Sequence, residues 1–327
     1  MNYELKYMQR CIQLAKCGEM GAAPNPMVGA VIVYNDTIIG EGYHRRCGGP
    51  HAEVNAIRSV RNESLLKEST IYVSLEPCSH YGKTPPCADL IIEKQIPRVV
   101  VGCMDPFAKV NGQGIKKLRD AGVEVVVGVL EKECLDLNRK FITFQRHHRP
   151  WVMLKWAQSE DGFMDAQRQA GEKPVKFSSA FTQTLVHRMR AMSQAIMVGT
   201  NTVLLDNPTL TTRMWEGPNP LRVTIDRNGV LPDSVHLKDG KVPTVIYEDG
   251  DLKQMLDDLY KRGVQSLLVE GGAQLIQRFI DSDLWDEARV EVAPITLRNG
   301  VSVPKMMNAE LVKEVVLDGR KILNYKR

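Results

Sequence analysis

The sequence predicts a two-domain α/β protein, on the basis of its length, its alternating strand and helix patterns, and a charged stretch in its middle. Its 327 residues exceed one typical domain and suit two, and 43% hydrophobic residues can fill two cores. Alternation of apolar runs with helical repeats is typical of an α/β sandwich with a mixed sheet. Residues 131–150 lack a strand pattern, so we interpret them as a short helix and a linker. We therefore expect domains at residues 1–148 and 149–327.

The first domain is predicted to begin with an amphipathic helix, because Tyr7, Met8, Cys11 and Ala15 recur at helical spacing. Apolar runs then predict strands at residues 27–33, 37–43, 70–75, 98–103 and 123–129. Helical patterns between them predict helices at residues 51–61, 88–94 and 112–121.

The second domain repeats this alternation without any internal sequence repeat. Strands are expected at residues 151–157, 195–198, 221–226, 244–247, 266–270 and 289–293. Helices are expected at residues 180–192, 252–262 and 273–280.

Composition excludes several classes of protein. The net charge of +4 and the absence of a block of like charges disfavour nucleic-acid binding. No apolar run is long enough for a membrane span, and the charged N-terminus does not resemble a signal peptide. Seven cysteines, all within the first 134 residues, do not form a typical disulfide framework and favour a reducing cytoplasm. We expect a cytoplasmic protein, with a homo-oligomer left open as an alternative to a monomer.

Three residues in the first half have the types and order of a catalytic zinc site. His51 lies in Pro-His-Ala-Glu at a predicted helix start, Cys78 follows Glu-Pro, and Cys87 follows Pro-Pro. Zinc prefers nitrogen and sulfur ligands, and catalytic sites combine three protein ligands with an open position for water. Cys47 or Cys103 could instead complete a closed structural site. A capping histidine and two buried thiols are the alternative without metal.

Glu53 is the candidate catalytic base. On an ideal helix it would lie about 200° around from His51, so the two share a cavity only within the first turn. Zinc lowers the pKa of bound water to about 7, and a carboxylate can carry the released proton to the substrate. Zinc deaminases have H-x-E followed by P-C-x-x-C. Here eight residues separate Cys78 from Cys87.

In the second half, residues 267–272, Leu-Leu-Val-Glu-Gly-Gly, form an apolar strand that ends in a double glycine before a helix. Free N–H groups at a helix start favour an anion, and glycine permits close approach of a phosphate. A tight turn between strand and helix explains the pattern equally well, and the Rossmann fingerprint is absent.

Over nearly its whole length the sequence resembles the bifunctional deaminase-reductases of riboflavin biosynthesis. The resemblance lies in residues 76–87, Glu-Pro-Cys-Ser-His-Tyr-Gly-Lys-Thr-Pro-Pro-Cys, and in residues 24–29, Pro-Asn-Pro-Met-Val-Gly. It implies a cytidine-deaminase-like three-layer sandwich. The implied reaction is deamination of 2,5-diamino-6-(5-phosphoribosylamino)pyrimidin-4-one by zinc-activated water. Asn25 would hold the pyrimidine, and His80 and Lys83 would lie near the substrate and its phosphate.

For the second domain the resemblance implies a dihydrofolate-reductase-like fold that uses NADPH to reduce the ribosyl group to ribityl. The matching positions include Lys155, Arg190 and residues 205–208, 210–213 and 270–272. The implied cofactor residues are Ala157, Thr202, Asp206, Gly272, Ala273, Gln274, Leu275, Ile276, Gln277 and Arg278. The implied substrate residues are Lys155, Arg190, Leu210, Arg213 and Glu270. Arg227, just after a predicted strand, is either a partner for the 2′-phosphate of NADPH or a turn residue.

The second domain departs from the family at two places. The family often has Ser-Leu-Asp-Gly and Gly-x-Ser-x-Trp-Ile; here residues 159–162 are Ser-Glu-Asp-Gly and residues 174–178 are Pro-Val-Lys-Phe-Ser. The segment at residues 165–173 is longer and more polar. These departures leave an alternative, a deaminase whose second domain is a degenerate nucleotide-binding or structural module.

Overall fold

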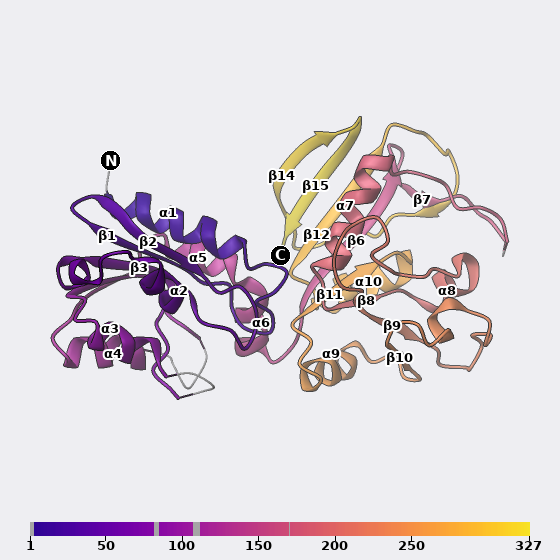
Figure 1. Cartoon of the computed structure of the whole chain (residues 1–327). Coiled ribbons are helices and arrows are strands. Elements are labelled where there is room, and N and C mark those ends of the chain that lie inside the picture. The colour runs from indigo at the N-terminus through magenta and orange to yellow at the C-terminus, as the bar shows by residue number, and fades with distance from the viewer. Residues whose placement is uncertain (1–2, 82–84, 107–111, 170) are drawn as a thin grey trace. The chain divides into compact units, whose positions relative to one another are not determined.

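The computed structural model describes residues 3–81, 85–106, 112–169 and 171–327 (Figure 1). The chain divides into two compact units, Met1–His147 and His148–Arg327. Among the described residues, no helix has both the length and the apolar character needed to cross a membrane.

The first unit is built on a five-stranded mixed sheet. Its strands are β1 (Gly29–Tyr34), β2 (Thr37–Tyr43), β3 (Thr70–Leu75), β4 (Arg98–Cys103) and β5 (Glu124–Val127). Their order is β2-β1-β3-β4-β5, with β1 antiparallel to both neighbours and β3, β4 and β5 parallel. The carboxyl ends of β3 and β4 therefore meet at one edge of the sheet.

Helices cover both faces of this sheet (Figure 1). The helices are α1 (Tyr3–Lys16), α2 (Ala52–Ser59), α3 (Cys87–Glu93), α4 (Gln113–Asp120), α5 (Glu131–Leu137) and α6 (Arg139–His147), with a 3-10 helix η1 at Glu63–Glu68. Residues 71, 73, 99 and 101 of the strands pack against α2, α3 and α4. The intervening residues 72, 100 and 103 pack against α1 and α5. The alternation of burial along the strands thus produces a three-layer α/β/α sandwich.

The linker predicted before residue 150 is wrong, because residues 139–147 form α6. Phe141 and Thr143 are buried beneath its charged surface. Asn138, between α5 and α6, accepts a hydrogen bond from the Met27 amide at 2.8 Å and donates one to its carbonyl at 2.9 Å. The segment is therefore an integral part of the first unit.

The second unit is built on an eight-stranded sheet. Its strands are β6 (Trp151–Ser159), β8 (Ala195–Met197), β9 (Leu221–Ile225), β10 (Thr244–Tyr247), β11 (Ser266–Glu270), β12 (Glu287–Ala293), β14 (Glu310–Leu317) and β15 (Arg320–Lys326). The order is β10-β9-β8-β11-β6-β12-β15-β14, and only β15 runs antiparallel to its neighbours, β12 and β14. A separate pair joins β7 (Phe163–Asp165) to β13 (Val301–Ser302).

The two faces of this sheet carry different helices. Helices α9 (Leu252–Lys261) and α10 (Ala273–Asp281) cover one face, over alternate apolar residues of five strands. The other face carries α7 (Ala180–Ala191) and α8 (Thr200–Asp206), which contribute Met189 and Val203 to a smaller apolar cluster. A 3-10 helix, η2, lies at His236–Lys238.

Three features of the second unit were not predicted from the sequence. They are the β7–β13 pair, helix α8 and the β14–β15 hairpin. Most residues of β14 are exposed, so its sequence lacks the apolar alternation that identifies a half-buried strand.

Candidate functional site

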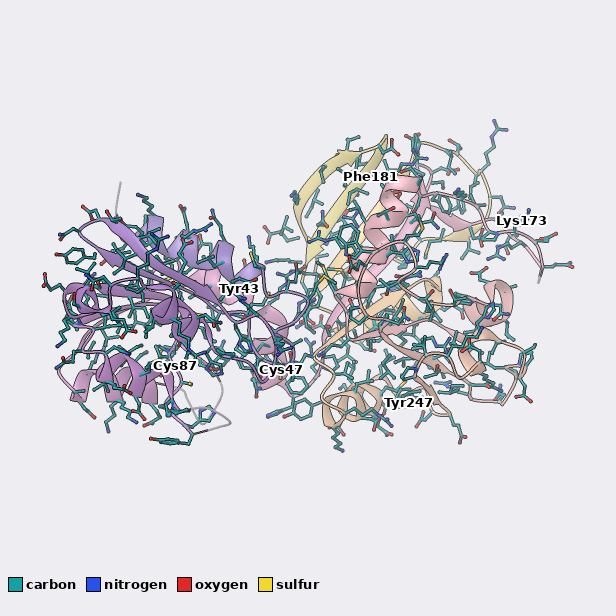
Figure 2. All side chains as sticks on the ribbon, in the orientation of Figure 1. Tyr43, Cys47, Cys87, Lys173, Phe181 and Tyr247 are labelled. Carbon is teal, nitrogen blue, oxygen red and sulfur yellow. The ribbon has the colours of Figure 1, made fainter. Side chains whose placement is uncertain are left out.

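The three expected zinc ligands come from three separate elements of the first unit. His51 is the residue that precedes α2, and Cys78 follows β3. Cys87, labelled in Figure 2, is the first residue of α3. Nδ1 of His51 lies 3.5 Å from Sγ of Cys78 and 3.4 Å from Sγ of Cys87. The sheet edge and two helix starts thus bring together residues up to 36 positions apart.

These separations suit a zinc ion. Zinc–sulfur and zinc–nitrogen bonds of about 2.3 and 2.1 Å at a tetrahedral angle place nitrogen and sulfur about 3.6 Å apart. All three ligand atoms lie within 4.8 Å of one another. Cys47 is exposed, and Cys103 is buried on the α1 side of the sheet, where its thiol donates to the Ser74 carbonyl. Within the described part of the chain, the cluster therefore has three members, and a closed four-ligand site is not supported.

The thiol of Cys78 lies in surroundings that favour a thiolate. Hydrogen bonding from Cys87, and then from His51, lowers the pKa of Cys78 to about 4. The backbone amide of Cys87 also donates to this sulfur at 3.3 Å. Thiolate is the form that binds a metal, so the first unit holds this ligand ready for binding.

Glu53 is in the first turn of α2, and its side chain is 3% exposed. Burial raises the pKa of Glu53 to about 7, the Cys78 sulfur adds to the rise, and His51 opposes it. The first-turn position lets Glu53 and His51 reach the same cavity although they are two residues apart. A carboxyl group with a pKa near neutrality can both accept and donate a proton.

Asn25 is connected to the ligand cluster through His44, a residue that the sequence did not single out. Nδ2 of Asn25 lies 3.1 Å from Nε2 of His44, whose Nδ1 lies 3.1 Å from the Pro50 carbonyl oxygen. The His44 ring meets the His51 ring edge-on, with centroids 5.3 Å apart. His44 is 2% exposed and therefore fixes the Asn25 amide beside the cluster.

Glu76 of the Glu-Pro-Cys motif has a structural role. The buried carboxylate of Glu76 accepts hydrogen bonds from the amides of Gly112 and Gly114, each at 2.9 Å. Glu76 thereby holds the start of α4 beside the loop that carries Cys78. His80 is exposed in that loop, and Lys83 lies outside the described residues.

In the second unit, Lys155 and Glu270 occupy directly opposite positions on β6 and β11. Arg190 of α7 binds both oxygens of Glu270, through Nε at 2.9 Å and Nη2 at 2.7 Å. Burial lowers the pKa of Lys155, Glu270 and Glu291 oppose this, and Arg190 adds to it. The Arg190 guanidinium, despite the opposing effect of burial, holds the pKa of Glu270 below its usual value.

The loop that follows α8 is hydrogen-bonded to Arg190 of the Arg190–Glu270 ion pair. Nη1 of Arg190 donates to the Thr211 carbonyl at 3.2 Å, and His187, which is 1% exposed, is buried on the same helix, α7. Leu210 is buried, whereas Arg213 is exposed, and its Nη1 lies 3.4 Å from Oγ1 of Thr209. Arg190 therefore helps to hold the loop that carries Arg213.

The double glycine lies against α8. Gly271 and Gly272 have φ of 71° and 75°, which favour glycine over residues with a side chain. A Cβ on Gly272 would lie 3.2 Å from Oγ1 of Thr202 and 3.9 Å from the Gly199 amide nitrogen. The starts of α8 and α10 are therefore adjacent, and their free N–H groups suit an anionic group.

Only part of the expected cofactor segment is accessible. Leu275 and Ile276 are buried in the core beneath α10. Ala273, Gln277 and Arg278 are half-buried, Gln274 is exposed, and Ala157 is half-buried on β6. Because the side chains of Leu275 and Ile276 are buried, these two residues can contact a cofactor only through their backbone.

Asp206, the last residue of α8, is paired with Arg168. Arg168 also binds Asp165 at 2.5 Å, and its side chain is only 6% exposed. Asp165 in turn accepts the Val175 amide at 3.1 Å. The segment that departs from the family is thus joined through Arg168 to Asp206, an expected cofactor residue; the sequence did not single out Arg168.

Arg227 and Arg278 meet at one backbone position. A Cβ on Gly250 would lie 1.8 Å from Nη2 of Arg227, so this guanidinium packs on Gly250. Nη2 of Arg278 donates to the Gly250 carbonyl oxygen. Two guanidinium groups therefore lie near each other at this edge of the second unit.

Comparison with known proteins decides the family. Residues 1–103 match the cytidine and deoxycytidylate deaminase zinc-binding region, and residues 150–318 match the RibD C-terminal domain. The riboflavin biosynthesis protein RibD of Aquifex aeolicus is 35% identical, over 97% of this chain and 94% of that protein. The RibD protein of Bacillus amyloliquefaciens is 37% identical, over 93% and 88%. The chain belongs to the RibD family.

Solved structures agree with this membership. A Thermotoga maritima diaminohydroxyphosphoribosylaminopyrimidine deaminase/5-amino-6-(5-phosphoribosylamino)uracil reductase has a TM-score of 0.90 and 36% identity, with 99% of this chain and 98% of that chain covered. Acinetobacter baumannii RibD has a TM-score of 0.89 and 33% identity, with the same coverage. As a RibD family member, the chain is a bifunctional deaminase and reductase of riboflavin biosynthesis, with a zinc-binding deaminase region. The fold class predicted from the sequence is confirmed.

Two residues that contact expected site residues, His44 and Arg168, could not be identified from the sequence, for different reasons. His44 follows β2 in Gly-Tyr-His, and a single histidine after a strand carries no metal or catalytic signature. Arg168 lies in a polar stretch that reads as an exposed loop. Only the fold brings them to Asn25 and Asp206.

Proposed function

We propose that the first unit hydrolyses 2,5-diamino-6-(5-phosphoribosylamino)pyrimidin-4-one to 5-amino-6-(5-phosphoribosylamino)uracil and ammonia. The main support is the convergence of His51, Cys78 and Cys87 beside a buried Glu53. Three nitrogen and sulfur ligands with ion-compatible spacing suit a catalytic zinc ion, which leaves one position for water.

We assign a role in this reaction to each expected site residue of the first unit. Zinc bound by the three ligands would make a water molecule acidic at neutral pH. Glu53 would accept the first proton from this water and deliver it to the ring nitrogen, and then carry the second proton, from the hydroxyl of the tetrahedral adduct, to the departing amine. Asn25, fixed by His44, orients the pyrimidine through its amide. His80 and Lys83 are proposed to lie near the substrate and its phosphate.

We propose that the second unit then reduces the ribosyl group to ribityl with NADPH. The cofactor supplies a hydride for C1′ of the opened sugar. Lys155, Glu270 and Arg190 form the polar row on which the sugar would lie, with Leu210 lining it. Arg213, which is exposed, offers a guanidinium to the phosphate.

The cofactor has a proposed path across the second unit. Its pyrophosphate would lie at the adjacent starts of α8 and α10, near Thr202 and Gly272. Ala157 and Asp206 would line the nicotinamide half, and the accessible residues 273–278 would continue the site. Arg227 and Arg278, which meet at Gly250, would bind the 2′-phosphate and favour NADPH over NADH.

The seven cysteines are free in the structure. This supports, as a proposal, a reducing cytoplasmic location for the enzyme.

The test follows ammonia release and NADPH oxidation separately, on the full chain and both substrates. Cys78→Ser should lose ammonia release, whereas Cys17→Ser, a change at an exposed free cysteine, should keep it. Both variants should oxidise NADPH when given 5-amino-6-(5-phosphoribosylamino)uracil. Ammonia release by Cys78→Ser at the wild-type rate would contradict the zinc site, and a failure of wild-type protein to oxidise NADPH would contradict the reductase proposal.

A further inference from the structure

A half-buried guanidinium group that has no acceptor among the described residues, that of Arg289, lies next to Lys155 in the second unit. Arg289 on β12 is directly opposite Lys155 on β6, just as Glu270 is opposite Lys155 on the other side. Directly opposite residues of parallel strands point to the same face of a sheet, and neighbouring strands lie about 4.8 Å apart. Lys155 and Arg289 therefore extend side by side on the face that carries α7.

Two of the three guanidinium nitrogens of Arg289 find no acceptor among the described residues. Its Nε and Nη2 are buried and have no hydrogen-bond partner. Among the described residues, neither Arg289 nor Lys155 forms an ion pair or a side-chain hydrogen bond. Burial lowers the pKa of Arg289, which reflects an environment that disfavours its charge. Buried polar atoms are almost always hydrogen-bonded, so these two nitrogens call for an acceptor.

The two carboxylates near Arg289 and Lys155 already accept hydrogen bonds from other side chains. Both oxygens of Glu270 accept from Arg190. Glu291, which is 1% exposed, accepts Ser178 at 2.9 Å through one oxygen and Thr182 at 2.7 Å through the other. Three cations, Lys155, Arg190 and Arg289, thus accompany the two carboxylates of Glu270 and Glu291. Lys155 and Arg289, which have no partner among the described residues, are neighbours.

We propose that Arg289 and Lys155 together bind an oxyanion, of the phosphate class, on the α7 face of the second unit. The guanidinium offers two donors in a planar fork that matches a phosphate, and the ammonium offers a third from the adjacent strand. The oxyanion is either free phosphate or the phosphate of the proposed reductase substrate, which Arg289 and Lys155 would then bind in place of the exposed Arg213. This last identification rests on the proposed function, whereas the site itself does not.

The test measures binding of inorganic phosphate to the full chain by titration calorimetry and by the shift in melting temperature. Arg289→Met keeps the length of the side chain and removes the charge. Lys321→Met is the control, because it removes one charge from β15, lies opposite Val292 rather than on the Arg289 face, and is 54% exposed. Arg289→Lys keeps a cation without the fork.

We expect phosphate to bind wild-type protein and Lys321→Met alike, at least tenfold more weakly to Arg289→Met, and with intermediate affinity to Arg289→Lys. Without phosphate, Arg289→Met should melt at a higher temperature than wild-type protein, because it no longer buries an unpaired charge. That measurement also shows that the variant is folded. Equal binding of phosphate by wild-type protein and Arg289→Met, or no binding by wild-type protein, would overturn the proposal.

A second arm separates the two sources of the oxyanion. Phosphate that inhibits NADPH oxidation competitively with 5-amino-6-(5-phosphoribosylamino)uracil, in wild-type protein but not in Arg289→Met, identifies the substrate phosphate as the occupant. Binding that depends on Arg289 but does not compete identifies a site for free phosphate. Binding that depends on Arg289 in a chain that never oxidises NADPH would support the site and contradict the proposed reductase function.

Discussion

Replacing Glu53 by Gln tests the deaminase chemistry and the electrostatics of the first unit together. The amide cannot carry a proton from water to the substrate, and general acid–base catalysis contributes on the order of 10²–10⁴-fold. Because Glu53 is proposed to serve several proton transfers, we expect a loss of ammonia release at the upper end of that range. Zinc content should stay at one ion per chain, since Glu53 is outside the ligand cluster.

The same change has a predictable effect on stability in metal-free protein. Burial raises the pKa of Glu53 from 4.5 to about 7, so the native state disfavours the ionised carboxylate. At about 1.4 kcal/mol for each pKa unit, the penalty at pH 8 is about 3 kcal/mol. It is absent below pH 4.5 and grows as the pH rises to about 7. Metal-free Glu53→Gln should therefore be more stable than wild-type protein at pH 8 and equally stable at pH 4.5.

Hydrogen exchange of peptides from β3 and α2 measures this difference within the first unit. Glu63→Gln is the matched control, because Glu63 is an exposed partner of Lys94. Loss of zinc from Glu53→Gln would make Glu53 a support of the metal site. Retention of more than about a tenth of the ammonia-release rate would mean that another residue carries the proton. Equal stability at pH 8 would refute the electrostatic part of the reasoning.

Other predictions concern the second unit, whose four tryptophans make its unfolding visible by fluorescence. Arg190→Gln or Glu270→Gln alone should lower the free energy of unfolding by about 3–5 kcal/mol, because each leaves a buried charge unpaired, and the double variant should recover stability but not NADPH oxidation. Arg227→Ala should raise KM for NADPH more than KM for NADH; an unaltered ratio would remove Arg227 from the 2′-phosphate site. Burial, with Arg190 and Arg213, lowers the pKa of His187 below 6.5, so the unfolded state binds more protons in acid. The free energy of unfolding should therefore fall as the pH drops below 6.5, less steeply in His187→Gln; parallel pH profiles would contradict this.

The metal site was accessible to sequence reasoning because its ligands lie where local structure changes. His51 precedes a helix, Cys78 follows a strand and Cys87 begins a helix. The carboxyl ends of parallel strands and the starts of the helices that follow them lie at one edge of the sheet. Residues at these places along the chain are therefore expected to lie close together. His44 has no such signature, and its role depends on contacts with Asn25 and Pro50 that only the fold reveals.

The segment at residues 139–147 shows how charge can mislead. Its many basic residues suggest a linker, yet Phe141 and Thr143 lie on one buried face of α6. The helix forms because tertiary contacts outweigh the polar composition, and Asn138 fastens its start to the loop before β1. Amino-acid composition alone does not reveal these tertiary contacts, so it cannot predict the helix.

In the second unit the limit of sequence reasoning is the pairing of charges. The resemblance supplied Arg190, Glu270 and Asp206, but not the fact that these residues are already paired, Arg190 with Glu270 and Asp206 with Arg168. Paired groups hold their geometry and offer little net charge to an anionic substrate. The charges that remain available include Lys155, Arg289 and Arg213, which have no carboxylate partner among the described residues. An anion that enters this unit should therefore gain most of its attraction from residues other than the ion pairs that shape the site.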